Sequence, residues 1–166
     1  MLILITGGAR SGKSSFAEKL AADFKNVTYI ATAQPFDDEM LKRIAKHQSR
    51  RPRHWSTVEA PFDAHNLINS LRSDCILFDC LTVYLSNFLC RQPDSDPTDY
   101  CQKLRDALKN FNGTSLVVTN EVGCGIVPIN ALARAFRDHQ GFINQQFAAD
   151  ADQVYFCACG LPLRLK

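Results

Sequence analysis

Residues 7–14 have the types and spacing of a loop that binds phosphate. They run Gly-Gly-Ala-Arg-Ser-Gly-Lys-Ser and match the pattern G-x-x-x-x-G-K-[ST], after an apolar run at residues 2–6 and before a helical pattern. The glycines allow successive backbone N–H groups to turn inward around phosphate oxygens, and a helix N-terminus adds favourable partial charge there. A glycine turn beside a surface lysine is the alternative, but strand, loop and helix occur in the order that phosphate binding requires. We therefore expect a phosphate-binding loop here.

Three side chains extend this prediction to a nucleotide and a metal ion. Lys13 is expected to bridge the β- and γ-phosphates, and the Ser14 hydroxyl is expected to bind Mg²⁺. A metal site of this kind also needs a carboxylate, which Asp79 supplies at the end of the apolar run 75–79. Asp79 could instead cap the helix that follows it. In either role it lies at the carboxyl end of a strand, where open α/β sheets place their ligands.

His47 is a candidate nucleophile. Residues 36–52 begin with acidic side chains, end with basic ones and close on a proline, which predicts a helix with His47 near its C-terminus. An imidazole there could attack the α-phosphorus of a nucleotide and form a phosphoramidate, from which the nucleotidyl group passes to a second acceptor. Arg50 and Arg51 could hold the phosphates during that attack. The spacing also places His47 on the apolar stripe of that helix, as in a packed, hydrogen-bonded histidine. The pattern by itself leaves both interpretations open.

The other histidines and one glutamate have weaker signals. His54, His65 and His139 lack any metal-ligand spacing, so surface or structural positions are expected for them. Glu121 follows an apolar run and could accept the proton of a substrate hydroxyl or order a metal-bound water. It could equally brace the turn at residues 123–125, and the sequence does not separate these roles.

The elements that must position these groups alternate between strand and helix. Apolar runs of strand length, with helical spacing between them, occur at residues 2–6, 27–31, 75–79, 116–119 and 154–158. Near-continuous runs indicate strands covered on both faces, and the alternation predicts parallel βαβ units. A surface loop is expected at residues 92–98, which contain two prolines and two aspartates. The predicted fold class is α/β, a P-loop NTPase-type fold with a mainly parallel sheet flanked by helices.

Length and composition limit the class of protein. The 166 residues are enough for one well-buried core, so a single domain spanning residues 1–166 is expected. Apolar residues make up 46% and charged residues 22%, as in globular rather than disordered, fibrous or membrane proteins. The 19 basic and 17 acidic residues leave a formal charge of +2, with one dense basic cluster at Arg50, Arg51 and Arg53. This charge is too small for a nucleic-acid groove, so a phosphate-bearing small molecule is the expected partner.

The N-terminus and the cysteines indicate the compartment. Five apolar residues at the start pass at once into glycines, which is too short a run for a signal peptide or a membrane span. The seven cysteines form an odd set without a C-x-x-C pair, which is typical of reduced, structural thiols. A cytoplasmic protein without membrane insertion is therefore expected.

Taken together, the motifs resemble the bifunctional adenosylcobinamide kinase/adenosylcobinamide-phosphate guanylyltransferases of cobalamin biosynthesis, over almost the whole chain. The phosphate loop indicates only a superfamily, whereas Asn120-Glu-Val-Gly combined with the His47 segment is far more specific. The other residues that carry the resemblance are Tyr29-Ile-Ala-Thr-Ala, Asp38-Glu-Met, Arg43-Ile, Arg51-Pro with Trp55, Thr57-Val-Glu59-Ala-Pro, Asp79-Cys-Leu-Thr, Asn87, Cys124-Gly-Ile-Val-Pro128, Ala133-Arg, Phe136-Arg-Asp, Gly141, Asn144-Gln and the ending Gly160-Leu-Pro-Leu-Arg-Leu-Lys.

The resemblance implies two reactions at one nucleotide site, with His47 and Lys13 as catalytic residues. A terminal phosphoryl group of ATP or GTP would pass to the aminopropanol hydroxyl of adenosylcobinamide. GMP from GTP would then pass through a guanylyl-histidine at His47 to adenosylcobinamide phosphate, giving adenosylcobinamide-GDP and pyrophosphate. The family's nucleotide contacts fall on Gly7, Gly8, Ala9, Arg10, Ser11, Gly12, Lys13, Ser14, Ala31, Thr32, Ala33, Gln48, Ser49, Arg50, Arg51, Glu59 and Asp79.

The resemblance also implies a homo-oligomer, since family members are trimers. The chain departs from the family at Val83-Tyr84, where Leu-Trp is frequent, and residues 91–113 carry no family motif, so corrinoid contacts there are not assigned. Two other functions are compatible with a phosphate loop. One is a simple small-molecule kinase in which His47 is structural, and the other is a nucleotide-dependent interaction module.

Overall fold

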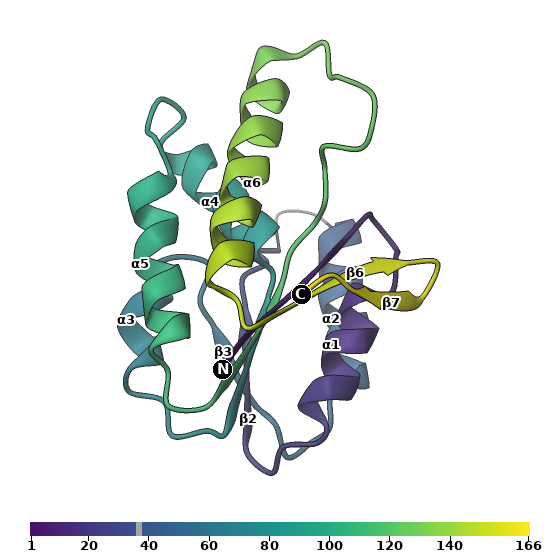
Figure 1. Ribbon diagram of the computed structural model, residues 1–166, viewed down its shortest axis with the longest axis vertical. Coiled ribbons are helices and arrows are strands. Elements are labelled where there is room, and N and C mark those ends of the chain that lie inside the picture. The colour runs from purple at the N-terminus through teal and green to yellow at the C-terminus, as the bar shows by residue number, and fades with distance from the viewer. Residues whose placement is uncertain (36–37) are drawn as a thin grey trace.

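The computed structural model describes residues 1–35 and 38–166, which are arranged around one seven-stranded sheet (Figure 1). The strand order is β3-β2-β4-β5-β1-β6-β7, and neighbouring strands are parallel except for β6 and β7. This arrangement confirms the predicted α/β class with a mainly parallel sheet. The strands are β1 (Leu2–Gly7), β2 (Val27–Ala31), β3 (Ser56–Glu59), β4 (Cys75–Asp79), β5 (Thr114–Val118), β6 (Gln153–Ala158) and β7 (Leu161–Arg164).

Helices cover both faces of the sheet, which explains why its central strands are continuous apolar runs. Side chains of β1 alternate between the two faces. Ile3 and Ile5 pack in the cluster that contains Ala17 of α1, whereas Leu2 and Leu4 pack in the cluster formed with α3 to α6. The helices are α1 (Lys13–Ala21), α2 (Asp38–Arg50), α3 (His65–Ile68), α4 (Leu81–Arg91), α5 (Thr98–Lys109) and α6 (Ala131–Asp150).

Two strands were not predicted, and both lie at the edges of the sheet. All four residues of β7 are exposed, and so are all residues of β3 except Val58, which is half-buried. An edge strand with solvent around it needs no apolar run, so the hydrophobic pattern that indicates central strands is missing. The remaining strands are found where they were predicted, with shifts of one or two residues at their ends.

The predicted helix around His47 is α2, which begins at Asp38. The first two residues of the predicted range, Phe36 and Asp37, lie outside the described part of the chain. The predicted surface loop at residues 92–98 is non-helical as far as Pro97, and α5 begins at Thr98. Asp96 stabilises that start by accepting hydrogen bonds from the backbone N–H and the hydroxyl of Thr98.

The seven cysteines are free thiols, as predicted. Burial raises the pKa of both Cys75 and Cys101 to about 12, so these two thiols remain protonated and unreactive at neutral pH. None of the described helices is both long and apolar enough to cross a membrane.

Candidate active site

The phosphate loop joins β1 to α1 at the carboxyl ends of the parallel strands. The backbone has positive φ angles of 148° at Gly7, 56° at Arg10 and 96° at Gly12. A Cβ atom on Gly7 would lie 2.3 Å from the carbonyl oxygen of Cys157, and one on Gly12 would lie 2.9 Å from Cα of Gly160. Both glycines are therefore required by the path of the backbone and by the close approach of the chain at Cys157 and Gly160.

The turn between β6 and β7 supports this loop, a contact that was not predicted. Gly160 in that turn donates its backbone N–H to the carbonyl oxygen of Ser11 at 2.9 Å. From another direction, the N–H of Glu121 donates to the carbonyl oxygen of Gly7 at 3.0 Å. Both contacts join residues that are far apart in the sequence, so no local pattern indicates them.

Lys13 lies inside the loop that it is predicted to serve. It is 7% exposed, and its Nζ donates to the carbonyl oxygen of Gly8 at 2.7 Å. Burial lowers the pKa of Lys13, an effect opposed by the nearby groups of Cys80 and Asp79. The hydroxyl of Ser11 is buried in the same loop and has no hydrogen-bond partner among the described residues. A buried donor without a partner is suited to a phosphate oxygen.

Asp79 ends β4 at the same edge of the sheet. The N-cap of α4 is Cys80, whose Sγ accepts the N–H of Val83 at 3.4 Å, so the alternative role of Asp79 as a helix cap is not observed. Instead, Asp79 Oδ2 accepts a 2.7 Å hydrogen bond from the hydroxyl of Tyr29. Burial, reinforced by Asp79, raises the pKa of Tyr29 far above its ordinary value, so the tyrosine remains a donor. The carboxylate is thereby oriented while its side chain stays 12% exposed.

His47 approaches this carboxylate from α2. Its Nδ1 lies 4.0 Å from Asp79 Oδ2, and 34% of its side chain is exposed. The guanidinium of Arg51 stacks over the Tyr29 ring, 3.5 Å from the ring centroid. Its Nε is buried and has no hydrogen-bond partner among the described residues. The predicted nucleophile, an arginine and the carboxylate predicted for the metal site therefore lie together, close enough to the phosphate loop for Asp79 to act on the charge of Lys13.

Several other predicted nucleotide contacts lie around this centre. Ala31 pairs with Glu59 on one side and with Asp79 on the other, so three neighbouring strands present predicted residues at one edge. In α2, Gln48 and Ser49 are exposed, whereas the side chain of Arg50 lies outside what the structure describes. Within the loop and its continuation, Ala9 and Arg10 are exposed, and Gly8, Ser14 and Ala33 are half-buried.

Thr32 is engaged inside the protein. It is fully buried, and its hydroxyl donates to the carbonyl oxygen of Cys80 at 2.9 Å while accepting the Cys80 N–H at 2.8 Å. Its own N–H donates to the backbone carbonyl oxygen of Asp79, and its carbonyl oxygen accepts a hydrogen bond from Asn87 Nδ2. The nucleotide contact predicted for Thr32 stays a prediction. In the structure, Thr32 stabilises the turn after β4 through its hydrogen bonds to Asp79 and Cys80.

A buried polar network supports the segment after β5. The Thr119 hydroxyl donates to Asn144 Oδ1 at 2.7 Å, and Asn144 Nδ2 donates to the carbonyl oxygen of Asn120 at 3.0 Å. Gln140, fully buried, donates to both Thr119 and Asn144. The Oε1 atom of Glu121 accepts the N–H of Gly123 at 2.6 Å, which is the bracing role considered for it.

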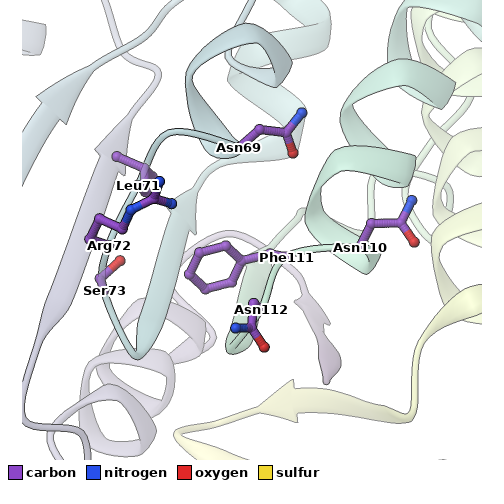
Figure 2. A pocket seen from close by; sticks show the side chains of 7 residues that line it. All are labelled: Asn69, Leu71, Arg72, Ser73, Asn110, Phe111 and Asn112. Atoms are coloured by element: carbon purple, nitrogen blue, oxygen red, sulfur yellow. The ribbon is translucent and has the colours of Figure 1, made fainter.

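The two described cavities lie elsewhere, at the amino ends of the parallel strands. One, of about 350 Å³, lies where α3 and α5 lead into β4 and β5, and its seven lining side chains include Arg72, Ser73 and Phe111 (Figure 2). The other, of about 370 Å³, includes His54 among its lining residues. Parallel sheets place ligands at the carboxyl ends of their strands, so we assign the chemistry to the phosphate loop and Asp79 rather than to these hollows.

Known proteins resemble this chain over its full length. The family described as cobinamide kinase/cobinamide phosphate guanyltransferase matches residues 3–165. The bifunctional adenosylcobalamin biosynthesis protein CobP of Pseudomonas aeruginosa is 44% identical over 170 residues, covering 98% of this chain and 96% of that protein. The proteins named CobU of Salmonella typhimurium and Escherichia coli are each 42% identical over 181 residues, covering all of both chains. The chain belongs to the cobinamide kinase/cobinamide phosphate guanyltransferase family.

Proposed function

We propose that this chain phosphorylates adenosylcobinamide with ATP or GTP and then transfers GMP from GTP to adenosylcobinamide phosphate, giving adenosylcobinamide-GDP and pyrophosphate. Membership of the family supports both activities, and the three relatives are named as bifunctional. The observation that carries the proposal is the position of His47, 4.0 Å from the carboxylate of Asp79, which in turn acts on the charge of Lys13 in the phosphate loop. A phosphate cradle next to an imidazole suits nucleotidyl transfer as well as phosphoryl transfer.

In the first reaction, the aminopropanol hydroxyl of adenosylcobinamide attacks the γ-phosphorus in line with the bond that breaks. That bond joins the γ-phosphorus to the bridging oxygen, and the nucleoside diphosphate leaves with the electron pair. The hydroxyl proton passes to solvent. The N–H groups of the loop and the ammonium of Lys13 lie where they would counter the charge on the phosphate oxygens.

In the second reaction, His47 attacks the α-phosphorus of GTP and pyrophosphate leaves. Its Nδ1 faces Asp79, which favours a proton on Nδ1 and leaves Nε2 as the attacking nitrogen. A phosphate oxygen of adenosylcobinamide phosphate then attacks the guanylyl phosphorus, the P–N bond breaks, and the imidazole recovers its electron pair. Arg51 is suited to hold the phosphates during both attacks because its Nε is buried and unpaired among the described residues.

Mg²⁺ enters this proposal as the ion that accompanies the nucleotide. Ser14 and Asp79 are the residues that would hold it, since hydroxyl and carboxylate oxygens suit this cation. Among the described residues, no group of three or more His, Cys, Asp or Glu side chains could hold a metal alone. That donor set fits Mg²⁺, which usually takes one or two carboxylates and completes its shell with phosphate oxygens and water. When bound, the ion would neutralise charge on the phosphates.

Mass spectrometry of the intact protein after incubation with GTP tests the proposal. We expect one GMP-sized adduct and release of pyrophosphate. In parallel, ATP and adenosylcobinamide should give ADP and adenosylcobinamide phosphate. Phosphorylation without any adduct would reduce the function to that of a simple kinase. Nucleotide binding without either reaction would instead indicate an interaction module.

We also propose that residues 1–166 act as one domain, in the cytoplasm, and that copies of the chain assemble into a homo-oligomer, with a trimer expected. One sheet running from β3 to β7 supports a single domain, and seven free thiols suit a reducing compartment. The loop before α6, which projects with the start of that helix beyond the sheet (Figure 1), supports assembly. Its Ile126 and Ile129 are 97% and 99% exposed. Arg134 holds the loop by donating to the carbonyl oxygen of Pro128.

Light scattering coupled to size-exclusion chromatography checks the assembly. We expect three times the mass of one chain for the wild type. The assembly should dissociate when Ile126 and Ile129 are both replaced by aspartate, because burying unpaired charges in an interface has a large free-energy cost. Leu41→Asp, a change at a half-exposed leucine on α2, is the matched control and should leave the mass unchanged. A wild-type protein that stays monomeric at high concentration would contradict this proposal.

A further inference from the structure

Tyr29 lies between the metal-side carboxylate and the end of the histidine helix, and its two parts make different contacts. It is only 2% exposed in the middle of β2. Its hydroxyl donates to Asp79 Oδ2 at 2.7 Å, and its ring is covered by the Arg51 guanidinium at 3.5 Å. The sequence motif around Tyr29 supported the family resemblance, but no role was assigned to this side chain.

The hydroxyl contact determines the orientation of Asp79. A hydrogen bond from a hydroxyl to a carboxylate is short and strong compared with one between neutral groups. Here it uses Oδ2, the oxygen that also faces His47 Nδ1. Without that donor the carboxylate would be free to rotate about χ2, and both its direction toward the phosphate loop and its distance from the imidazole would change.

The ring contact determines the position of Arg51. This residue immediately follows α2, so a guanidinium held on the ring also restrains the end of the helix that carries His47. A second, weaker restraint is the contact of its Nη1 with Thr57 Oγ1 in β3, at 3.5 Å. Stacking occupies the face of the guanidinium and leaves its edges available for phosphate oxygens.

We propose that Tyr29 is a positioning residue with two separable effects on the two reactions. Its hydroxyl orients Asp79 and so supports both phosphoryl transfer and guanylyl transfer. Its ring orients Arg51 and the end of α2, and so supports guanylyl transfer through His47 alone. This inference depends on the proposed function. The competing explanation is that Tyr29 is only a core residue of the α1 face, in which case Tyr29→Phe would leave both rates unchanged and Tyr29→Leu would lower both equally.

Two substitutions separate the hydroxyl from the ring. Tyr29→Phe keeps the ring and removes the hydroxyl, whereas Tyr29→Leu removes both. Tyr155→Phe is the matched control, because the Tyr155 hydroxyl donates to Gln153 within β6, and phenylalanine keeps the ring contact with Phe16 of α1. For each variant, the initial rate of protein labelling by α-labelled GTP is compared with the initial rate of adenosylcobinamide phosphorylation by ATP, and thermal unfolding is followed alongside.

We expect Tyr29→Phe to lower both rates by a similar factor, roughly tenfold, as for loss of a hydrogen bond to a charged group. Tyr29→Leu should lower labelling by a further factor of about five, as for loss of a cation–π contact, without lowering phosphorylation further. Tyr155→Phe should leave both rates unchanged. If Tyr29→Phe matches the wild type in both reactions, the role of the hydroxyl is overturned.

A double-mutant cycle with Arg51→Ala decides the role of the ring. If the ring acts through Arg51, Tyr29→Leu should slow labelling much less in the Arg51→Ala background than alone. Fully multiplicative effects would overturn that role. Should Tyr29→Leu fail to fold, Tyr29→Met, which also lacks the ring, takes its place in the cycle. An Arg51→Ala substitution that slows labelling no more than phosphorylation would by itself overturn the role of the ring. A wild-type protein that phosphorylates adenosylcobinamide but takes no label would refute the guanylyl half of the proposed function, while the phosphorylation rate of Tyr29→Phe would still decide the role of the hydroxyl.

Discussion

His47→Ala is expected to abolish covalent labelling by α-labelled GTP, a loss of at least about 10³-fold, because no other group can form the intermediate once the attacking nitrogen is gone. In the wild type, the label should be acid-labile and base-stable, as a phosphoramidate is. Phosphorylation of adenosylcobinamide should change little, because that reaction needs the loop, Lys13 and Asp79 but no imidazole. The measurement is retained radioactivity on the denatured protein, with product formation from ATP followed in parallel.

His54→Ala is the matched control for this prediction. His54 is exposed and lines a cavity at the amino ends of the strands, opposite the phosphate loop, so its loss should leave both rates unaltered. Full labelling of the His47→Ala protein would show that another residue carries GMP. If instead both reactions were lost together, with an unchanged unfolding temperature, His47 would be contributing to nucleotide binding rather than acting as a nucleophile.

Lys13→Met is expected to suppress both reactions, by about 10²- to 10³-fold each, the usual cost of removing one preorganised electrostatic donor. Its ammonium is buried inside the loop, where it donates to the carbonyl oxygen of Gly8. Both transfers place negative charge on phosphate oxygens, so both should suffer, in contrast to the selective loss expected for His47→Ala. Initial rates of labelling and of phosphorylation provide the measurement.

Stability distinguishes this effect from a folding defect. Burial lowers the pKa of Lys13, which means that the folded protein bears a cost for holding the charge, and methionine removes that cost with a similar chain length. The unfolding temperature of Lys13→Met should therefore be equal to or above that of the wild type. Lys19→Met, an exposed lysine in the last turn of the same helix, is the control and should retain both activities. A Lys13→Met protein with normal rates would remove the loop from the mechanism.

Local signals were sufficient for the centre of the fold and for the phosphate loop. Strands covered on both faces need apolar side chains at nearly every position. Such a run of apolar residues can be recognised from a few neighbouring positions in the sequence. The loop is also local, since its glycines, lysine and hydroxyl follow one another between β1 and α1. The strands β3 and β7 were not predicted because most of their side chains are exposed to solvent, so no apolar run marks them in the sequence.

Sequence alone determined the central strands, the loop, the family resemblance and the identities of Lys13, His47 and Asp79 as candidates. Only the tertiary structure decided that Tyr29 holds Asp79, that Arg51 stacks on Tyr29, and that Gly160 supports the loop at Ser11. The physical reason is distance along the chain. Propensity and periodicity describe neighbours in sequence, whereas these contacts form between residues that meet only after β2 has paired with β4 and β1 has paired with β6 in the sheet.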